Sequence, residues 1–449
     1  IQPTREIRKV AFASLVGTTI EWYDFVIYGQ AAALVMNRLF FPEFDPAVGA
    51  LASLATFGVG FVARPVGGIV FGHLGDRVGR KTTLVTTLLI MGLATVLVGL
   101  LPTYAQIGIW APIALVVLRL LQGFAVGGEW GGAVLMSVEH APAAKRGFYA
   151  SWAQLGIPLS LILATGTLVG ISAAVPEDAF DSWGWRLPFL FSAVLVVVGL
   201  VIRLRVEESP VFTRMRAAGR QAKLPIAEIL RTAKKQVLLT TGVCAGVNVG
   251  FYVISVYAIA YATNTVHLSR NETLVALITG AAVDFVAILF FAMLSDRVGR
   301  RPILMFGNVF LAVFAYPYFA MAASGSVWLL TLATVLGLAL GHAPIYAVTS
   351  SFFAESFQAR ARYSGISLSY QLAAALISGP TPFVAAALVV GFGGFAPVVI
   401  MMAVAALLSL ACVVFLAETR HREIDDADEP HPAAPDRLDA ENRKVSPRG

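Results

Sequence analysis

Long apolar runs recur along this chain almost to its C-terminal end, and they constrain its fold most strongly. A helix of about 20 apolar residues crosses the hydrocarbon core of a bilayer. Twelve segments approach or exceed that size: 10–36, 47–72, 82–101, 109–138, 148–175, 187–206, 236–262, 273–294, 303–323, 327–353, 363–390 and 395–417. Only 13% of the residues are charged, against about 25% in soluble domains. We therefore expect an all-α protein with twelve transmembrane helices in a lipid bilayer.

The basic residues predict the orientation of these helices. Lys and Arg gather in alternate connections: Arg77, Arg80 and Lys81; Lys145 and Arg146; the stretch 203–235; Arg297, Arg300 and Arg301; Arg360 and Arg362. Because short cytoplasmic loops are enriched in these residues, we expect both termini and the central linker in the cytoplasm. The formal charge of +6 is then explained by topology, and no nucleic-acid partner is expected.

An internal repeat predicts two similar halves. The segment Asp76–Arg80 (DRVGR) returns as Asp296–Arg300, and the Glu139/Arg146 pair is echoed by Glu355 and Arg362. Such repeats are typical of transporters that rock around a site near the bilayer midplane. We expect a six-helix half in 1–206, a cytoplasmic linker in 207–235, a second six-helix half in 236–417 and a disordered tail in 418–449.

Six ionisable residues lie well inside the predicted helices: Glu21, Asp24, Arg64, Arg119, Glu129 and Asp284. A charge at the centre of a membrane helix costs about 3 kcal/mol when it faces lipid. We therefore expect all six to face the bundle interior. They form either a cavity that handles protons and a charged solute, or a set of buried ion pairs that lock helices together.

The acidic members of this set are candidate proton sites. Glu21 and Asp24 are three residues apart, so we expect them on one helix face, where mutual repulsion favours uptake of a proton. Glu129 and Asp284 are further candidates. Structural ion pairing is the alternative for each acid. The ring of His342, near Asp284 in predicted depth, is more typical of a satisfied hydrogen-bonding group than of a titrating one.

Arginines, tyrosines and Gln122 within the predicted helices are candidates for substrate binding. Arg119 stays charged at any relevant pH and can hold a carboxylate with two parallel hydrogen bonds or stabilise an ionised acid on another helix. Arg64 lies at a depth similar to that of Glu129, and the two form either part of a substrate site or a simple pair. Tyr23 and Tyr28 either line a pocket or only pack.

Several motifs carry a resemblance to a known family. The segment Gly72–Lys81 (GHLGDRVGRK) resembles the loop motif of the major facilitator superfamily, and Arg119–Gly123 (RLLQG) resembles its helix-four motif, which includes Gln122. Five shorter segments are similar to those of its metabolite:proton symporters: Glu21–Phe25, Arg64–Pro65, Gly128–Gly132, Trp183–Arg186 and Glu208–Pro210. Two features depart from the pattern: Gln358–Ala359 replaces an expected Pro-Thr, and Asp284 matches no family residue.

The resemblance implies a function as well as a fold. Members of this family import shikimate, 2-oxoglutarate, citrate, proline or betaine with protons, across the bacterial inner membrane. We therefore expect import of a small organic acid or related metabolite by proton symport, with no cofactor and no enzymatic activity. A proton-independent sugar-type facilitator is the alternative, although Thr240–Val243 lacks the paired glutamines expected there.

The charged residues of the repeated loops are expected to act together rather than to touch substrate. We interpret them as a conformational latch, a set of salt bridges that form in the outward-facing state and break in the inward-facing state: Asp76, Arg80, Glu139, Asp296, Arg300 and Glu355. The alternative is that these residues set topology alone. Nucleotide-binding loops, nucleophile elbows and metal-ligand clusters are not found in the sequence.

Overall fold

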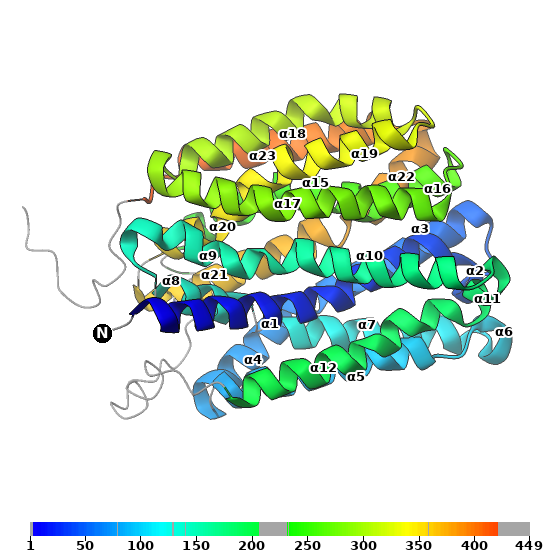
Figure 1. Cartoon of the computed structure of the whole chain (residues 1–449), viewed down its shortest axis with the longest axis horizontal. Helices are drawn as coiled ribbons and strands as arrows, with labels where there is room; N and C mark the ends of the chain where they lie inside the picture. Colours follow the sequence, from blue (N-terminus) through cyan, green and yellow to red (C-terminus); the bar gives the residue numbers. More distant parts are fainter. Residues whose placement is uncertain are drawn as a thin grey trace, which may run out of the picture.

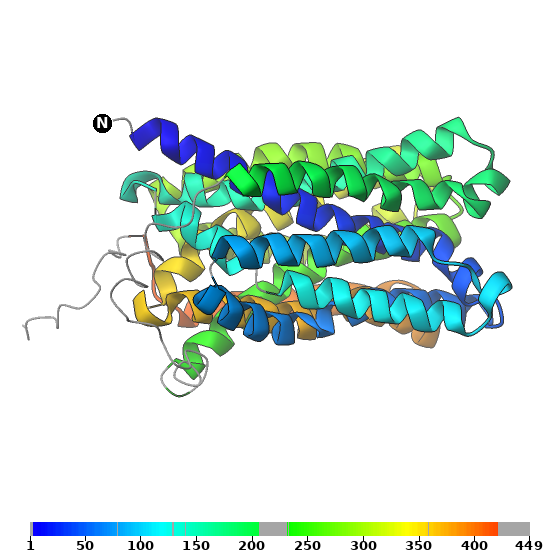
Figure 2. The same ribbon diagram turned by 90° about the horizontal axis from the view of Figure 1, so that it is seen from below.

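A computed structural model describes residues 3–78, 80–127, 130–139, 141–205, 231, 233–357 and 359–420 of the chain. The regular elements of these residues are helices, and the two perpendicular views show them running along the long axis of the molecule (Figures 1 and 2). The prediction of an all-α fold is confirmed. The helices connect into an antiparallel bundle, with the N-terminus at one end (Figure 1).

The helices of the N-terminal part correspond to the first six predicted segments. They are α1 (Pro3–Ala31), η1 (Ala32–Met36), α2 (Asn37–Phe40), α3 (Pro46–Val62), α4 (Arg64–Val78), α5 (Arg80–Leu100), α6 (Tyr104–Ile107), α7 (Trp110–Val126), α8 (Trp130–Glu139), η2 (Ala143–Lys145), α9 (Arg146–Gln154), α10 (Gly156–Ala174), α11 (Glu177–Ser182), η3 (Gly184–Arg186) and α12 (Leu187–Arg205). The start of α3 illustrates the local signals, because Asp45 accepts a hydrogen bond from the Ala47 N–H and Pro46 fits the first turn.

The helices of the C-terminal part correspond to the last six segments. They are α15 (Lys234–Tyr252), η4 (Val253–Tyr257), α16 (Ala258–Asn264), α17 (Arg270–Val298), α18 (Arg300–Ala322), α19 (Val327–Leu336), η5 (Gly337–His342), α20 (Ala343–Ser356), α21 (Ala359–Ala373), η6 (Ala374–Ser378), α22 (Thr381–Phe392) and α23 (Ala396–Phe415). Helix α17 starts at a capping box between Ser269 and Glu272 and ends at Gly299, whose φ of 106° suits glycine.

Ten helices among the described residues are long and apolar enough to cross a membrane, and Trp110–Val126 is a shorter apolar helix. The remaining predicted segment is α1, whose apolar stretch contains Glu21 and Asp24. Four of the long helices contain a π-helical turn: η1, η4, η5 and η6. The turns η1 and η4 begin 221 residues apart, close to the spacing of the repeated loop motif, so the internal repeat extends to this irregular geometry.

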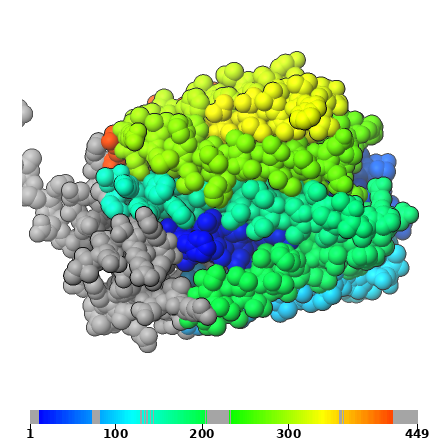
Figure 3. Space-filling view, in the orientation of Figure 1, coloured from blue at the N-terminus to red at the C-terminus, as the bar shows by residue number. Residues whose placement is uncertain are grey.

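The two halves are packed closely against each other. Helices α9 and α10 contact α17, and α3 contacts α22. The space-filling view shows the surface of α17 lying directly against that of α10 (Figure 3). We call the end of the bundle that contains the start of α1 and Arg300 the basic end, and the end that contains Asp181 and Arg270 the opposite end.

The beginning of the predicted tail departs from expectation. Glu418 accepts hydrogen bonds from the backbone N–H groups of Arg300 and Arg301, at 2.9 Å each, and thereby caps the start of α18. The hydroxyl of Thr419 donates to Glu355 at 2.7 Å. Residues 418–420 are therefore packed on the bundle, because their polar groups satisfy a helix N-terminus. Residues 206–230 and 421–449 lie outside the described part.

Candidate functional site

Asp24 of α1 is a buried acid at the centre of a hydrogen-bonded group. The residue is only 1% exposed to solvent. The hydroxyl of Thr95 in α5 donates to Oδ2 at 2.7 Å, and the hydroxyl of Ser192 in α12 donates to Oδ1 at 2.6 Å. Both carboxyl oxygens are thus satisfied by neighbouring helices of the same half. Asp24 is held in one position without a direct salt bridge among the described contacts.

Arg119 of α7 is linked to Asp24 through a short relay. Its Nη1 donates to Oε1 of Gln122 at 2.7 Å, and Nε2 of Gln122 donates to the hydroxyl of Thr95, also at 2.7 Å. That hydroxyl in turn donates to Asp24. The guanidinium also lies 3.9 Å from the ring centroid of Tyr28. This arrangement suits an arginine that stabilises an ionised acid on another helix, the second of the two roles considered for it.

Glu21 and Asp24 do not face the same neighbours. Asp24 points toward α5 and α12, whereas Glu21 lies within electrostatic range of Arg64 in α4. Positions three residues apart on a helix differ by about 60° in direction, which is enough to separate two short side chains in a close-packed interior. The two acids therefore occupy different environments rather than forming one pair.

Arg64 is a buried cation with unused hydrogen-bonding capacity. The residue is 1% exposed, and its Nε and Nη2 have no hydrogen-bond partner in the described structure. The guanidinium lies 4.1 Å from the ring centroid of Phe25 and 4.2 Å from that of Phe61. Cation–π attraction offsets only part of the cost of such burial. A guanidinium in this state favours an anionic partner.

Arg64 also lies close to the contact between the two halves. Tyr252, Tyr346 and Tyr370, all from the C-terminal half, are within electrostatic range of its guanidinium. The nearby indole N–H of Trp22 likewise has no hydrogen-bond partner in the described structure. Several donors from both halves thus converge in one region.

A small cavity lies beside this region. It has a volume of about 10 Å³, and its lining includes Trp22, Phe25 and Phe57 from the N-terminal half and Phe251 and Tyr252 from the C-terminal half. This volume suffices for about one water molecule. The site is therefore closed in this structure, and a metabolite would require the halves to separate.

Two tyrosines predicted to bind substrate have other contacts. The hydroxyl of Tyr23 donates to the carbonyl oxygen of Pro188 at 2.9 Å, within the N-terminal half. The hydroxyl of Tyr28 shares a 2.6 Å hydrogen bond with that of Thr56, and its ring lies beneath Arg119. Neither residue lines the cavity. Their substrate role stays a prediction, and the closed structure favours packing for both.

Asp284 and His342 form a buried pair in the C-terminal half. Nδ1 of His342, the last residue of η5, lies 3.1 Å from both carboxyl oxygens of Asp284, the central residue of α17. Each residue is 1% exposed. The sequence indicated both positions separately, but only the packing of α17 against η5 brings them together.

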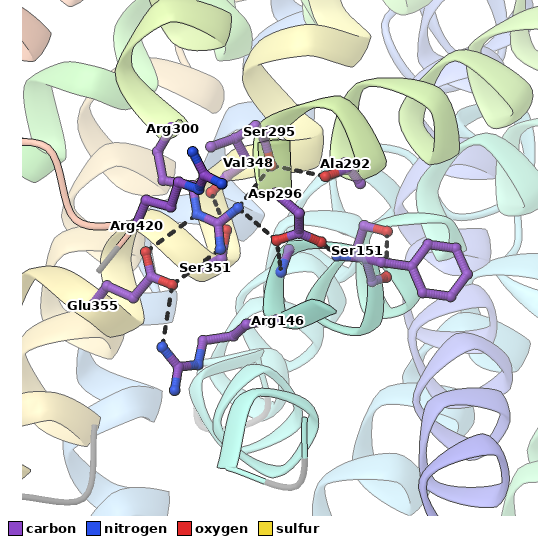
Figure 4. A network of polar contacts seen from close by, with 12 residues as sticks. Arg146, Ser151, Ala292, Ser295, Asp296, Arg300, Val348, Ser351, Glu355 and Arg420 are labelled. Carbon is purple, nitrogen blue, oxygen red and sulfur yellow. Dashed lines mark hydrogen bonds and ion pairs between the residues drawn. The ribbon is translucent and has the colours of Figure 1, made fainter. Parts of the chain in front are cut away.

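The predicted latch residues of the C-terminal half meet the N-terminal half at the basic end (Figure 4). Asp296 accepts hydrogen bonds from the backbone N–H groups of Gly147 and Phe148, at 2.9 and 3.0 Å. Arg300 contacts Asp296 at 2.7 Å and Glu355 at 3.1 Å, and Glu355 also lies 3.6 Å from Arg146. The network therefore bridges the two halves.

Four predicted site residues cannot be placed in this way. Glu129 lies outside the described residues, as do the side chains of Asp76, Arg80 and Glu139. Their proposed roles stay predictions. The latch residues whose side chains are described, Asp296, Arg300 and Glu355, all come from the C-terminal half.

The opposite end contains an ionic bridge that sequence reasoning missed. Arg270, at the start of α17, lies 3.5 Å from Asp181 and 3.7 Å from Glu177 of α11. Asp181 also contacts Arg38 at 2.7 Å. No motif marks these residues, and their loops carry too few charges to attract notice. Arg270 therefore joins the halves at this end, whereas Arg38 contacts Asp181 within the N-terminal half.

Other contacts between the halves are made by residues to which the sequence analysis assigned no role, although Trp130 lies in the Gly128–Gly132 segment. Nε2 of Gln154 donates to the carbonyl oxygen of Tyr346 at 3.0 Å, and Nε2 of Gln371 donates to that of Gly127 at 2.7 Å. The rings of Trp130 and Tyr370 stack with their centroids 3.7 Å apart. Amides and aromatic rings are common in helices of every kind, so only tertiary structure identifies these pairs.

Comparisons with known proteins agree with this architecture. The family model described as "Sugar (and other) transporter" matches residues 9–236, and that of the "Major Facilitator Superfamily" matches residues 249–445. The shikimate transporter of Escherichia coli K12 is 42% identical over 390 residues, which cover 86% of this chain and 89% of that protein. The proline/betaine transporter of Salmonella typhimurium LT2 is 35% identical over 444 residues, covering 96% and 87%.

A solved structure supports the fold independently. The proton:xylose symporter XylE superposes with a TM-score of 0.72 at 18% sequence identity, covering 93% of this chain and 97% of XylE. At this level of identity the likeness concerns the fold alone. It matches the prediction of twelve transmembrane helices in two similar halves.

Proposed function

The chain belongs to the major facilitator superfamily and is a membrane transporter of metabolites, and we propose that it imports a small organic acid by proton symport with alternating access. The observation that carries this proposal is that the N-terminal half contains two distinct buried sites. One is an acid with a hydrogen-bonded relay, Asp24, and the other is an arginine with unused donors, Arg64.

Asp24 supports the proton part of the proposal. Its carboxylate sits in a low-dielectric interior where an ionised acid is costly, and the relay through Thr95 and Gln122 connects it to Arg119. Motion of α7 relative to α1 would change how well Arg119 stabilises the ionised form. Such a change would let Asp24 bind a proton in one state and release it in the other.

Arg64 supports the organic-acid part. A carboxylate can accept two hydrogen bonds from one guanidinium in a geometry that no sugar hydroxyl reproduces. The free Nε and Nη2 of Arg64 are a pair of donors suited to this geometry. The shikimate transporter among the relatives is consistent with a carboxylate substrate.

Closure at both ends supports alternating access. The basic end is bridged through Asp296, the opposite end through Arg270, and the central cavity holds about 10 Å³. We interpret this arrangement as an occluded state between outward-facing and inward-facing forms. From the distribution of Lys and Arg we propose that the basic end faces the cytoplasm of a bacterial inner membrane.

A sugar-type facilitator is the second candidate, because the model that matches the N-terminal half is that of sugar and other transporters. Helix α15 argues against it. The hydroxyls of Thr240 and Thr241, which stand where paired glutamines were expected, donate to Ser369 of α21 and are used in packing.

Uptake into proteoliposomes separates these candidates. The full chain would be reconstituted, and labelled shikimate, betaine and xylose would each be offered with and without an inward proton gradient. We expect shikimate to accumulate only with the gradient and to leak out after a protonophore is added. Gradient-independent equilibration of xylose without accumulation of shikimate would support the facilitator instead.

The variant Arg64→Lys tests the substrate site within the same assay. Lysine keeps the charge but loses the planar fork, so shikimate affinity should fall by about 1.5–3 kcal/mol, the usual contribution of a hydrogen bond to a charged group. Arg38→Lys, at the exposed opposite end, is the matched control and should bind as the wild type does. Wild-type affinity in Arg64→Lys would exclude Arg64 from the carboxylate site.

A further inference from the structure

We propose that Asp284 and His342 form a second proton-binding site, located in the C-terminal half and separate from Asp24. Their side chains come from two different elements, α17 and η5, and meet with Nδ1 of His342 at 3.1 Å from both oxygens of Asp284. Each residue is 1% exposed. A carboxyl and an imidazole in this geometry share a proton readily, because each can donate to or accept from the other.

The surroundings of the pair make its charge sensitive to one proton. The titratable side chains on the neighbouring elements include the buried tyrosines Tyr252 of α15, Tyr318 of α18 and Tyr346 of α20. Elements packed against α17 also carry charged residues, among them Arg146 of α9, Arg300 of α18 and Glu355 of α20, which contact one another at the basic end. Helices α10 and α19, which also pack against α17, contain no ionisable residue. Without a shared proton the pair carries one net negative charge in an apolar interior, and with it the pair is neutral. A proton bound here would therefore be shared by the two groups rather than belong to one of them.

The pair also lies next to elements that must move when the halves separate. The ring of His342 lies 4.9 Å from that of Phe251, which lines the central cavity, and 4.8 Å from that of Tyr346. The carbonyl oxygen of Tyr346 accepts a hydrogen bond from Gln154 of the N-terminal half. Opening of this contact would bring water toward His342 and allow its proton to exchange.

The π-helical geometry of η5 adds a local reason for mobility. This turn, Gly337–His342, ends at the histidine itself. A π-helical turn carries one extra residue, and such turns occur often at functional sites. A shift of this turn would change the distance between His342 and Asp284 while leaving α17 in place. Proton binding and the position of η5 are thus coupled in this proposal.

Infrared difference spectroscopy tests the proposal without any substrate. The full chain would be reconstituted in lipid vesicles and stepped between about pH 8 and pH 5, the range in which an unperturbed imidazole changes its charge. We expect carboxyl or imidazole bands that change with pH in the wild type and are lost in both Asp284→Asn and His342→Gln. Loss in both variants is the signature of a pair that titrates as one unit.

Matched variants decide the assignment. Asp178→Asn removes an exposed carboxyl of α11 and should leave these bands unchanged, as should Asp24→Asn, which removes the acid of the other half. Asp284→Glu retains a carboxyl and should keep the bands at shifted positions, which guards against a folding defect in Asp284→Asn. Spectra of Asp284→Asn and His342→Gln identical to the wild type would show a permanent ion pair and overturn the proposal.

The second proton site depends on the proposed function only for its role in the transport cycle. The proton site and proton symport can therefore fail separately. If the bands are present but shikimate accumulation ignores the proton gradient, the proton site stands and the proposed function fails. If accumulation needs the gradient but no titrating bands depend on Asp284, the proposed function stands and this inference fails.

Discussion

At the scale of single residues, the protein separates two acids that look equivalent in its sequence. Asp24 is held by Thr95 and Ser192, and its relay leads to Arg119, whereas Glu21 faces the side of Arg64. The hydroxyl donors stabilise an ionised Asp24, while its burial disfavours that form. These opposing effects suit a group that must gain and lose a proton in one cycle.

The variant Asp24→Asn should uncouple transport from the proton gradient. An amide keeps the volume and one hydrogen-bond acceptor but cannot bind a proton in the same range. We expect accumulation of shikimate in proteoliposomes to be abolished, while exchange of internal for external shikimate continues. Ser192→Ala, which removes one donor but keeps the acid, should retain accumulation. Full accumulation by Asp24→Asn would transfer the coupling role to another acid.

At the scale of elements, glycines allow close contacts between helices, some within one half and some between the halves. Only the contacts between the halves must open when the halves separate. An added Cβ at Gly123 of α7 would overlap the carbonyl oxygen of Gly60 in α3, within one half. An added Cβ at Gly58 of α3 would lie 2.9 Å from the carbonyl oxygen of Gly379, in the other half. The first contact is needed for folding in every state, the second only when the halves are closed.

The variants Gly123→Ala and Gly58→Ala should therefore differ in kind. Overpacking within a half typically costs about 1–3 kcal/mol, so Gly123→Ala should lower the thermal unfolding temperature in detergent. Gly58→Ala should melt close to the wild type but lengthen the distance between spin labels at the exposed residues Val48 and Val390. Gly166→Ala, with open space around its Cβ, is the control. Equal destabilisation by Gly58 and Gly123 variants would refute the distinction.

The cap on α18 gives an element-scale prediction with a pH dependence. Burial alone would raise the pKa of the Glu418 carboxyl, but the backbone N–H groups of Arg300, Arg301, Thr419 and Arg420 hold that pKa below its usual value. A lowered folded-state pKa means that the cap stabilises the protein above the unfolded pKa and is lost as the pH falls through the folded pKa.

We therefore expect the cap to persist at neutral pH and to be lost only as the pH falls through the lowered pKa of Glu418, below the usual glutamate value. Glu418→Gln should weaken it at neutral pH, by about 0.5–2 kcal/mol as for other helix caps, and should have little effect at a pH where Glu418 is already protonated. Hydrogen exchange at the amides of Arg300 and Arg301 measures the effect directly. Exchange in Glu418→Gln equal to that of the wild type at neutral pH would show that the cap contributes nothing.

At the scale of the whole molecule, two polar bridges join the halves, one at each end of the bundle: hydrogen bonds to Asp296 at the basic end and an ion pair of Arg270 at the opposite end. Asp296 joins α17 to the start of α9 at the basic end, and Arg270 joins the start of α17 to α11 at the opposite end. Both bridges use one long helix, α17. Breaking one bridge should favour opening at that end, because the halves are then still joined at the other end and can rotate about that contact.

Spin-label distances test this balance. Asp296→Asn should lengthen the distance between labels at the exposed residues Ala144 and Val298 of the basic end. Arg270→Gln should instead lengthen the distance between labels at the exposed residues Asp178 and Thr265 of the opposite end. High salt should screen this ion pair in the wild type, because its partners are partly exposed. The difference in distance between Arg270→Gln and the wild type should therefore shrink at high salt. Distances unchanged in both variants would mean that the bridges do not control the equilibrium.

The sequence alone determined the class of the molecule and the position of most of its elements. Twelve apolar segments, the repeated loop motif and the buried charges were enough, because a bilayer requires about 20 apolar residues per helix and burial of every charge. The same rules indicated Asp24, Arg64, Arg119 and Asp284 as interior residues, and all four are buried.

Only the tertiary structure decided which of these residues meet. Local periodicity placed Glu21 with Asp24 on one face, but their partners come from helices more than forty residues away, such as Arg64 of α4 and Thr95 of α5. The pairing of Asp284 with His342 and the bridge of Arg270 to Asp181 likewise depend on how separate helices pack. Helical spacing fixes the direction of a side chain along its own helix, whereas its partner depends on packing between helices distant in sequence.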